Sequence, residues 1–455
     1  MSRSYFRDYD IRGPADDLDD QTVQRLGTAL ADLLRPAGGP PRVVVGRDAR
    51  TSSPRLHAAL VEGLVAGGAR VLDVGLGPSP LVYFAVHFTA ADGGVVTTGS
   101  HNPPGDNGFK ILRGHRPLFG AALRELDAKL DSAPVPAAER GTLTVTDARE
   151  AYVAEVTRTI GLGARRPRVI VDAGNGAAGS LGVEALRKVG LDPVCLFCDP
   201  DGTFPNRAPD PTEAQLTQLR EAVVEQQADL GLAWDGDGDR LGVIDRGGEF
   251  VCGDRLLALF ARQVLRQNPG GLVLGEVKCS QALFDDVERH GGRALMTRTG
   301  HSHLKVQMKE QGALVGGEIS GHFFFADRYL GYDDAIYASL RLVEIVAREG
   351  SSVKELLADL PQGEVTPEIR VECRHAHRVV DAVRAELEGE GRLIDIDGVR
   401  IAYPDGAWGL VRPSNTSDAL VLRFEAPTVE RLREVRSVVD SAIERAKQRV
   451  VGAPP

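Results

Sequence analysis

Cysteine is scarce in this chain, and its scarcity narrows the class of protein. Five cysteines among 455 residues are an odd and sparse set, which fits a reducing compartment better than a disulfide framework. Cys195 and Cys198 form a CxxC motif, but neither a second CxxC nor a histidine pair at zinc-finger spacing follows it. We therefore interpret both as core cysteines.

Long apolar runs and an excess of positive charge are missing too. No stretch approaches eighteen consecutive apolar residues, and the opening MSRSYFRDYDIRG lacks the apolar core of a signal peptide. The net charge of -10 argues against nucleic acid or an anionic membrane as partner, because both would require a basic surface. We expect a cytoplasmic protein that binds neither nucleic acid nor membrane.

A repeated rhythm runs through most of the chain. Three segments combine a short β-branched run, a turn and a helical pattern, and they begin with RVVVGRDAR, RVIVDAGNGAAG and GLVLGEVKCS. Strands that alternate with helices predict α/β layers, whereas the C-terminal part reads as α+β. We predict an α/β fold of three similar α/β domains plus a C-terminal α+β domain around a central active-site cleft, at residues 1–146, 147–248, 249–361 and 362–455.

The first candidate site is a loop around Ser100. The strand-like GGVVTT leads into GSHNPPGDNGFK, which is too rich in Gly, Pro and Asn to continue as strand or helix. Ligands bind at such strand ends in open α/β sheets, although an ordinary polar loop would have the same composition. No G-x-S-x-G elbow occurs, which disfavours acyl transfer. Lys110 is either a hydrogen-bond donor to a phosphate or an acid/base group, or else a solvated surface lysine.

A second loop concentrates carboxylates. In GLAWDGDGDRLGVI, three aspartates alternate with other residues between two apolar runs, so in extended chain they share a face. Carboxylates at such short distances repel one another unless a cation lies between them. Hard oxygen ligands suit magnesium. An EF-hand is excluded because Arg240 and Arg246 occupy its glycine and glutamate positions. The sequence predicts a magnesium site at Asp235, Asp237 and Asp239.

Two later loops are weaker signals, and each could be an ordinary turn. GGEISGH offers a carboxylate, a hydroxyl and an imidazole, and RPSNTSD offers a compact set of donors that can form a phosphate nest without a Walker lysine. VIVDAGNGAAG also contains G-x-G-x-x-G, formally a dinucleotide fingerprint with Asp199 downstream. An NAD-linked oxidoreductase would leave the other loops without a role, so we interpret these glycines as a tight strand-to-helix turn.

Taken together and in this order, the four loops resemble those of the α-D-phosphohexomutase superfamily, most closely its bacterial phosphomannomutase/phosphoglucomutase branch. The resemblance spans nearly the whole chain. It is carried by FRDYDIRG, TTGSHNPPGDNGFKI, DPDGTFPNRAPDP, WDGDGDRLGV, GGEISGHFFF, YLGYDDAIYA and RPSNTSDALVLRFEA. The family implies three similar α/β domains and a fourth of different type around a large cleft, to which each contributes one loop.

The resemblance also implies roles for single residues. Ser100 would be the phosphorylated serine and, with Asp235, Asp237 and Asp239, would hold one Mg²⁺ per subunit. Glu318 and Ser320 would bind sugar hydroxyls. The non-reacting phosphate of the substrate would bind Arg412, Ser414, Asn415 and Thr416. The acid/base or phosphate-contacting candidates are Lys110, Arg12 and His301, with Tyr9, Arg240, Lys278 and His322 around them.

The implied activity is an isomerase that interconverts hexose 1-phosphate and hexose 6-phosphate through phosphoserine and a hexose 1,6-bisphosphate. Contacts to the 3- and 4-hydroxyls would leave the 2-hydroxyl of the sugar without a specific contact, which implies action on both glucose and mannose. Glucose 1,6-bisphosphate would be the activator, and the enzyme would work as a monomer or weak dimer. Phosphoglucosamine mutase is the alternative, and Ile319 favours the hexose branch. Further alternative functions are a sugar-phosphate sensor, a bisphosphate synthase and a phosphatase. Asp418 stands where relatives often have proline, and would weaken phosphate binding if it points inward.

Overall fold

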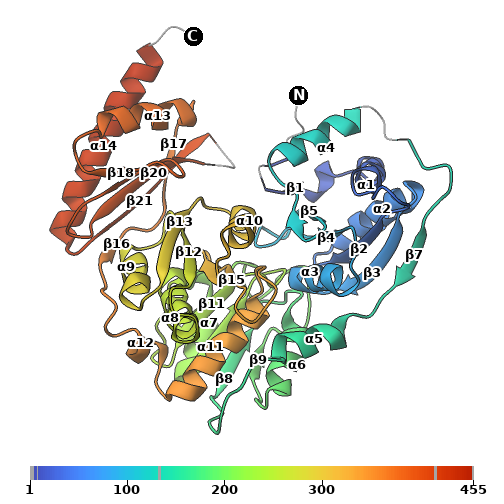
Figure 1. Ribbon diagram of the computed structural model, residues 1–455, viewed down its shortest axis with the longest axis horizontal. Coiled ribbons are helices and arrows are strands. Elements are labelled where there is room, and N and C mark those ends of the chain that lie inside the picture. Colours follow the sequence, from blue (N-terminus) through green and yellow to red (C-terminus); the bar gives the residue numbers. More distant parts are fainter. Residues whose placement is uncertain (1–4, 8, 132–134, 415–417, 453–455) are drawn as a thin grey trace.

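The protein is described by a computed structural model, which covers residues 5–7, 9–131, 135–414 and 418–452 and arranges them around four β-sheets (Figure 1). Three of these sheets contain the same arrangement of strands. Each has three parallel strands and one antiparallel strand at the edge, in the orders β5-β4-β2-β3, β11-β10-β8-β9 and β15-β14-β12-β13. The three β-branched runs of the sequence are the equivalent strands β2, β8 and β12. The predicted α/β fold with three similar domains is confirmed.

The first sheet extends this arrangement with extra strands at both edges. β1 pairs antiparallel with β5, and β7 pairs parallel with β3. Helix α1 begins after Asp19, whose side chain accepts a hydrogen bond from the Thr22 amide, so the first turn is capped. The strands are β1 (Ile11–Pro14), β2 (Arg42–Arg47), β3 (Arg70–Leu76), β4 (Gly93–Thr97), β5 (Asp106–Arg113), β6 (Arg116–Pro117) and β7 (Thr142–Val145). The helices are α1 (Asp20–Leu33), α2 (Ser53–Ala66), α3 (Ser79–Phe88) and α4 (Ala121–Asp131).

The second and third sheets are smaller. Their central parallel strands are fully buried and mostly apolar runs, as expected for parallel strands covered on both faces. The second unit contains α5 (Arg149–Thr157), β8 (Val169–Asp172), α6 (Gly179–Lys188), β9 (Val194–Leu196), α7 (Thr217–Glu225), β10 (Leu230–Trp234) and β11 (Leu241–Asp245). The third contains α8 (Gly253–Gln267), β12 (Leu272–Glu276), α9 (Gln281–Arg289), β13 (Arg293–Thr297), α10 (His301–Gln311), β14 (Val315–Gly317), β15 (Phe323–Phe325), α11 (Ala335–Glu349) and α12 (Val353–Leu356).

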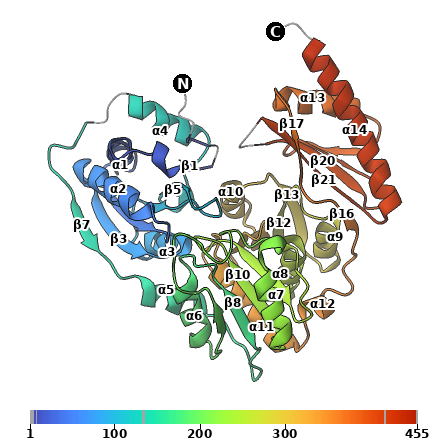
Figure 2. The same cartoon turned by 180° about the vertical axis from the view of Figure 1, so that it is seen from behind.

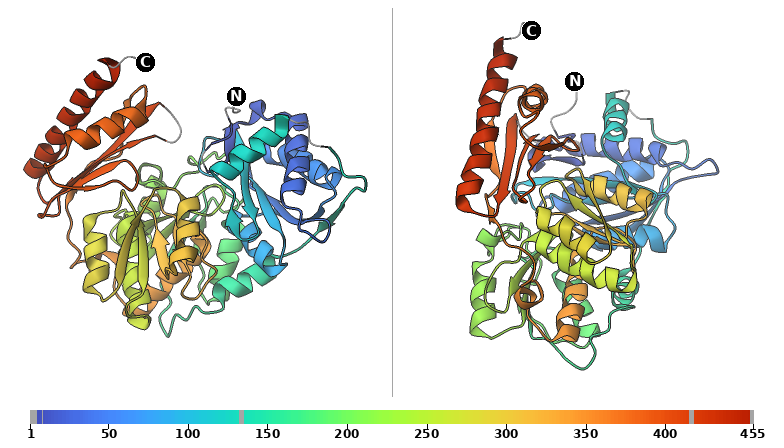
Figure 3. Two further views of the ribbon diagram at one scale, coloured as in Figure 1. Left: turned by 45° about the horizontal axis from the view of Figure 1, so that its top comes forward. Right: turned by 60° about the vertical axis from the view of Figure 1, so that its left-hand side comes forward.

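The fourth sheet is antiparallel, and α13 and α14 pack against it (Figure 3). This is the α+β pattern expected for the C-terminal part. Its elements are β16 (Glu364–Val365), β17 (Ile369–Glu372), α13 (Ala376–Glu386), β18 (Arg392–Ile394), β19 (Val399–Ala402), β20 (Trp408–Pro413), β21 (Ala419–Ala426) and α14 (Val429–Gly452). In Figures 1 and 2, the first and fourth sheets lie at opposite ends of the molecule, with the second and third between them. The domain boundaries at 146, 248 and 361 stay predictions.

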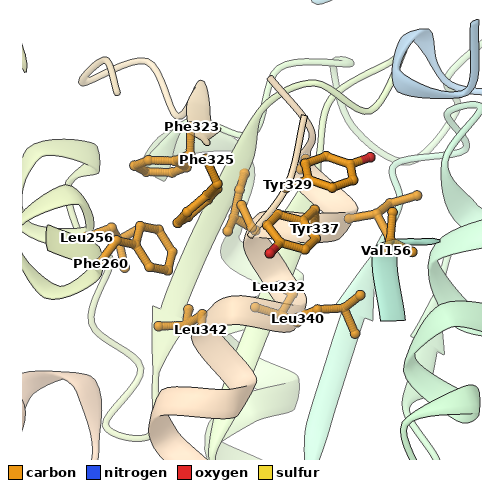
Figure 4. Close-up of a cluster of buried hydrophobic side chains, with 14 of the residues drawn as sticks. Val156, Leu232, Leu256, Phe260, Phe323, Phe325, Tyr329, Tyr337, Leu340 and Leu342 are labelled. Atoms are coloured by element: carbon orange, nitrogen blue, oxygen red, sulfur yellow. The ribbon is translucent and has the colours of Figure 1, made fainter. Parts of the chain in front are cut away.

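Helix α11 joins the second and third units into one core. It is buried from Ala335 to Ala347 and packs against Phe323 and Phe325 of β15 and Leu232 of β10 (Figure 4). The indole Nε1 of Trp234, at the end of β10, donates a 2.9 Å hydrogen bond to Ser339 in this helix. The fourth unit has an apolar cluster of its own.

One expectation from the sequence is wrong for Cys195. The CxxC pair is expected in a core, but Cys195 is exposed, while Cys198 is half-buried and packs against the large apolar cluster. Both belong to the segment around β9, the edge strand of the second sheet. The run PVCLFCD is apolar enough for a central strand, but an edge strand leaves alternate side chains in solvent. Among the described residues, no helix has the length and apolar character needed to span a membrane.

Candidate active site

The three α/β units carry their candidate loops at equivalent positions. The serine loop connects β4 to β5, the aspartate loop connects β10 to β11, and the GGEISGH loop connects β14 to β15. Each loop thus follows the carboxyl end of a parallel strand and turns back into the antiparallel edge strand. Parallel strands present ligands at this end. Repetition of one topology therefore accounts for three loops of unrelated sequence meeting at one place.

Ser100 lies in a strained and tightly braced turn. Its φ of 51° is in the left-handed region, which non-glycine residues rarely adopt. The buried guanidinium of Arg50 holds the loop by donating to the carbonyl oxygens of Ser100 at 2.7 Å and Asn102 at 2.6 Å. The Ser100 amide donates to the Thr98 hydroxyl at 2.8 Å. The result is a hydroxyl whose position is determined by the surrounding backbone, as strained functional residues require.

The aspartate loop lies directly against that hydroxyl. Asp235, Asp237 and Asp239 are all fully buried, with one carboxylate oxygen of each within 4.8 Å of the others. Ser100 Oγ is 3.4 Å from Asp235 Oδ2. Burial raises the pKa of Asp235 well above its ordinary value, and the charges of Asp237 and Asp239 add to the rise. The structure thus brings together the four predicted metal ligands.

Lys110, on β5, is the cation that balances this cluster. Its Nζ is 2.7 Å from Asp237 Oδ2, also contacts Asp239, and lies 3.5 Å from Ser100 Oγ. Burial lowers the pKa of Lys110, but the two carboxylates outweigh it and the pKa rises well above its usual value. One ammonium cannot neutralise three carboxylates, and Oδ1 of Asp237 and Oδ1 of Asp239 are buried without a hydrogen-bond partner. Hard oxygen donors with unused lone pairs fit a divalent cation such as magnesium.

Beside the aspartates, two histidines share a buried carboxylate. Asp333 lies 3.3 Å from Nδ1 of His301, 3.2 Å from Nδ1 of His322 and 2.6 Å from the Lys305 ammonium. Burial lowers the pKa of His301, and the positive charge of Lys305 lowers it further. His301 is therefore a neutral imidazole near pH 7, able to accept a proton.

Arg240 connects this cluster to the serine loop. Its Nε donates to Nε2 of His322 at 3.1 Å, and its Nη2 lies 3.3 Å from Nε2 of His101. Because His322 accepts at Nε2, its proton is on Nδ1, facing Asp333. Arg240 also pairs with Asp210 at 3.2 Å. Its guanidinium is thus held at three points.

Glu318 and Ser320 adjoin each other in the GGEISGH loop. The Ser320 hydroxyl donates to Glu318 Oε2 at 3.3 Å, and the Gly300 amide donates to Glu318 Oε1 at 2.5 Å. Lys278 lies 3.5 Å from Glu368. Tyr9 donates from its hydroxyl to the Thr299 carbonyl at 3.1 Å. These groups come from three units, and one segment, 298–300, lies among them.

Arg12 and Arg412 lie at the first and fourth sheets. Arg12 donates to Asn102 of the serine loop at 2.9 Å and pairs with Asp10 at 2.5 Å. Arg412, at the end of β20, pairs with Asp397 at 2.9 Å, and the Ser414 amide donates to the Ala419 carbonyl at 2.8 Å. The predicted phosphate residues Asn415 and Thr416 lie outside the described residues.

A cavity of about 570 Å³ connects these groups. Its walls come from the first, second, third and fourth units. The predicted residues that line it are Tyr9, Arg12, Arg240, Lys278, His301, Glu318, Ser320, His322, Arg412 and Ser414. Ser100, Lys110 and the three aspartates are buried, beneath His101 and Asn102 of the cavity floor. The volume suits a ligand of sugar size with a phosphate.

The glycines of the formal dinucleotide fingerprint serve packing. Gly174 has φ of 53°, and a Cβ on Gly176 would lie 2.9 Å from the Asp235 carbonyl oxygen. A Cβ on Gly179 would lie 2.0 Å from the Cys198 carbonyl oxygen. Gly176 lets the β8–α6 turn approach the backbone of the aspartate loop, and Gly179 lets it approach the segment after β9. This is the tight turn expected.

Several residues of this site were not found from the sequence. Arg50 resembles a surface cation of a loop, and Lys305 resembles a surface cation of a helix. Asp333 resembles a helix-capping acid, because its neighbour Asp334 does cap α11. Asp48 accepts from Thr98, Ser53 and Arg50 and thereby braces the serine loop from behind. The one available signal was the density of Asp and Arg immediately after β2, in GRDAR.

Comparison with known proteins agrees with this geometry. The phosphoglucomutase/phosphomannomutase alpha/beta/alpha domains I, II and III match residues 3–131, 150–248 and 252–363, and the C-terminal domain of the same family matches 368–442. A phosphomannomutase/phosphoglucomutase of Pseudomonas syringae is 41% identical over 97% of this chain and 95% of its own length. A phosphoglucomutase of Neisseria meningitidis serogroup A is 41% identical, over 98% and 97%.

A solved structure has the same fold over its whole length. It is a phosphoglucomutase/phosphomannomutase family protein from Burkholderia thailandensis, 39% identical, with a TM-score of 0.92 over 100% of this chain and 99% of the other. Identity at this level over nearly complete lengths, with all four domains in order, leaves one assignment. The chain belongs to the phosphoglucomutase/phosphomannomutase family.

Proposed function

We propose that this protein is a mutase that interconverts the 1-phosphate and 6-phosphate of glucose and of mannose, with Ser100 as the phosphoryl carrier. The observation that carries the proposal is the position of Ser100 Oγ, which lies 3.4 Å from Asp235 and 3.5 Å from Lys110. A nucleophilic oxygen beside clustered carboxylates and a lysine is suited to phosphoryl transfer, where positioning and charge stabilisation supply most of the catalysis.

In the first step, a hydroxyl of the bound sugar phosphate attacks the phosphorus carried by Ser100. The bond between phosphorus and Ser100 Oγ breaks, Lys110, whose Nζ is 3.5 Å from Oγ, gives that oxygen a proton, and the proton of the attacking hydroxyl leaves to a base. His301 fits this role because its imidazole is neutral and lines the cavity. Asp333 orients the ring through Nδ1. The product of this step is a hexose 1,6-bisphosphate.

In the second step, the phosphoryl group at the other end of the sugar returns to Ser100. Its phosphorus–oxygen bond to the sugar breaks as that to Ser100 Oγ forms, the proton of the Ser100 hydroxyl returns to Lys110, and His301 gives its proton back to the sugar oxygen. The bisphosphate must turn over between the steps, so its two phosphates exchange places. A cavity walled by all four units gives room for this turn, and glucose 1,6-bisphosphate would prime an unphosphorylated Ser100.

Charge on the transferred group requires cations. Bound by Ser100, Asp235, Asp237 and Asp239, magnesium would neutralise phosphoryl oxygens and raise the electrophilicity of phosphorus. Arg240 and Lys278 reach the same cavity from the second and third units. Arg412 and Ser414 would hold the phosphate that is not reacting, and Glu318 with Ser320 would hold the sugar hydroxyls.

A coupled mutase assay tests the proposal. We expect the wild type to convert both glucose 1-phosphate and mannose 1-phosphate with Mg²⁺ and catalytic glucose 1,6-bisphosphate. Ser100→Ala should lose activity by about a thousandfold or more, because the carrier oxygen is gone. Ser180→Ala, at an exposed serine of α6, is the matched control and should retain full activity.

Three results would contradict the proposal. Activity on glucosamine 1-phosphate alone would favour the phosphoglucosamine mutase alternative. Ser100→Ala with near wild-type turnover would remove the serine from the mechanism. Release of free bisphosphate in place of the isomerised monophosphate would indicate a synthase.

A further inference from the structure

The segment 298–300 is a junction between three units. The Thr299 carbonyl accepts from Tyr9 of the first unit, and the Thr299 hydroxyl donates to Glu276 of the third unit at 2.8 Å. The Thr299 amide donates to Asp397 of the fourth unit at 3.1 Å. Next to it, Arg298 Nε donates to the carbonyl oxygen of Ile396 at 2.8 Å. The fourth unit is therefore attached here through backbone groups as well as side chains.

Asp397 occupies the centre of this junction. Its Oδ2 lies 2.9 Å from Nε of Arg412 and its Oδ1 accepts from Nη2 at 3.4 Å, while Oδ2 also accepts from the Thr299 amide. The Arg412 side chain is only 6% exposed and that of Asp397 15%. A two-point carboxylate contact restricts the orientation of a guanidinium, and it leaves the Nη1 side for a second anion.

The turn that presents Asp397 is itself held against β20. Gly398 has φ of 78°, and a Cβ there would lie 2.3 Å from the Val411 carbonyl oxygen. Asp397 therefore cannot move away from Arg412 without moving this turn. On the other side, Gly300 follows Thr299 and donates to Glu318. One carboxylate thus connects the arginine of the fourth unit to the segment that also holds Glu318 and Tyr9.

We propose that Asp397 is a positioning residue, which orients Arg412 for the substrate phosphate and couples the fourth unit to the sugar-binding loop through the Thr299 amide. The inference rests on the proposed function, because it takes Arg412 as a phosphate-binding residue. Asp397 does not itself contact the substrate. Its carboxylate sets the direction of the guanidinium, and the Thr299 bond sets the distance between the phosphate site and Glu318.

Kinetics and binding of the wild type and four variants test this role. Asp397→Asn keeps the size and one acceptor but loses the charge. We expect its KM for glucose 1-phosphate to rise about fivefold to tenfold, the scale of one lost hydrogen bond, with kcat changed less than about twofold. In an Arg412→Ala background, the same substitution should add less than about twofold, because its effect passes through Arg412. Asp397→Glu, which keeps the charge, should recover part of the KM.

The control is Asp395→Asn, two residues away on the same turn. Asp395 is exposed and pairs with Arg384 at 2.7 Å, so its loss should leave KM unchanged. A KM for Asp397→Asn that is unchanged or lower would overturn the inference, and a lower value would mean that the carboxylate competes with phosphate. Full additivity with Arg412→Ala would also overturn it.

A binding measurement separates this inference from the proposed function. Calorimetric titration of each protein with glucose 1-phosphate requires no turnover. If the wild type binds the sugar phosphate but does not isomerise it, the proposed function fails while the effect of Asp397→Asn on affinity can still be read. Equal affinity of wild type and Asp397→Asn, with both folded, overturns the inference alone.

Discussion

Single residues of this site carry strain that the surrounding structure compensates. Ser100 has φ of 51°, a region that costs an L-residue about 1 kcal/mol or more. Four backbone carbonyls that accept from Arg50 hold the turn in this shape: Ser100, Asn102, Pro103 and Asp106. A left-handed serine directs its hydroxyl away from the strand direction, toward Asp235. The strain is therefore part of how the carrier oxygen reaches the metal-binding carboxylates.

Replacement of Ser100 by two different residues measures this strain. Ser100→Gly and Ser100→Ala should both be inactive, but the glycine variant should be more stable than the alanine variant by about 1 kcal/mol, since glycine adopts positive φ without a steric cost. Urea unfolding of both proteins gives the difference. Ala90→Gly is the matched control, at an exposed position with φ of 49°: it should gain similar stability and keep full activity. Equal stability of the two Ser100 variants would show that the turn is unstrained.

At the scale of elements, local sequence patterns predicted strands and loops, whereas contacts between residues distant in sequence could not be predicted. The β-branched runs predicted β2, β8 and β12, and acids spaced two apart after an apolar run predicted the aspartate loop, because strand periodicity and loop composition are local properties. Asp333 and Asp397 escaped notice, since each acts on residues distant in sequence. The edge position of β9 could not be read from PVCLFCD either, because strand order is a property of the whole sheet.

Helix α11 begins at a buried acid whose protonation affects stability. Asp334 caps the helix by accepting from the Tyr337 amide at 2.9 Å, and it also accepts from the hydroxyls of Tyr152 at 3.0 Å and Tyr329 at 2.7 Å. Burial raises the pKa of Asp334 to about 6, above the value of 3.8 for the free group. Between these values the folded state binds more protons than the unfolded state. Stability from this group is therefore complete below about pH 4 and is lost as pH rises to about 6.

Asp334→Asn removes this titration. We expect the stability of the wild type, measured relative to the variant, to fall by roughly 2–3 kcal/mol between pH 4 and pH 7. Thermal unfolding across this range measures the change, and the relative comparison cancels other titrating groups. Asp19, which caps α1 at the surface, is the matched control. Its hydrogen bond from the Thr22 side chain lowers the pKa of Asp19 below 3.8, so the corresponding difference for Asp19→Asn should have the opposite sign, with most of the change below pH 4 and little between pH 4 and pH 7. A pH-independent difference for Asp334→Asn would contradict the expectation.

At the scale of the whole molecule, the site exists only where the units meet. Ser100 and Lys110 come from the first sheet and the three aspartates from the second, and Ser79 of α3 donates to Asp237 across the same boundary. An acidic protein with net charge -10 gains nothing from a further buried cluster of like charge. The cluster is tolerable because Lys110 compensates part of it and a divalent cation would compensate the rest.

Magnesium should therefore stabilise the contact between the first two units. We expect the melting temperature to rise when Mg²⁺ replaces EDTA, because an ion that binds only the folded state adds about 2.7 kcal/mol at a hundred times its Kd. Asp237→Asn should abolish the rise, while Asp192→Asn, at an exposed acid, should preserve it.

Lys110→Ala sharpens this test, because Lys110 is the cation that now faces Asp237 and Asp239. Among the described residues, no other lysine or arginine side chain pairs with Asp237 or Asp239. Without the Lys110 ammonium, the variant in EDTA should therefore be less stable than the wild type. Mg²⁺ should then raise its melting temperature by more than it raises that of the wild type. An equal or smaller rise would mean that the lysine and the metal do not share the same carboxylates, and that the ion binds elsewhere.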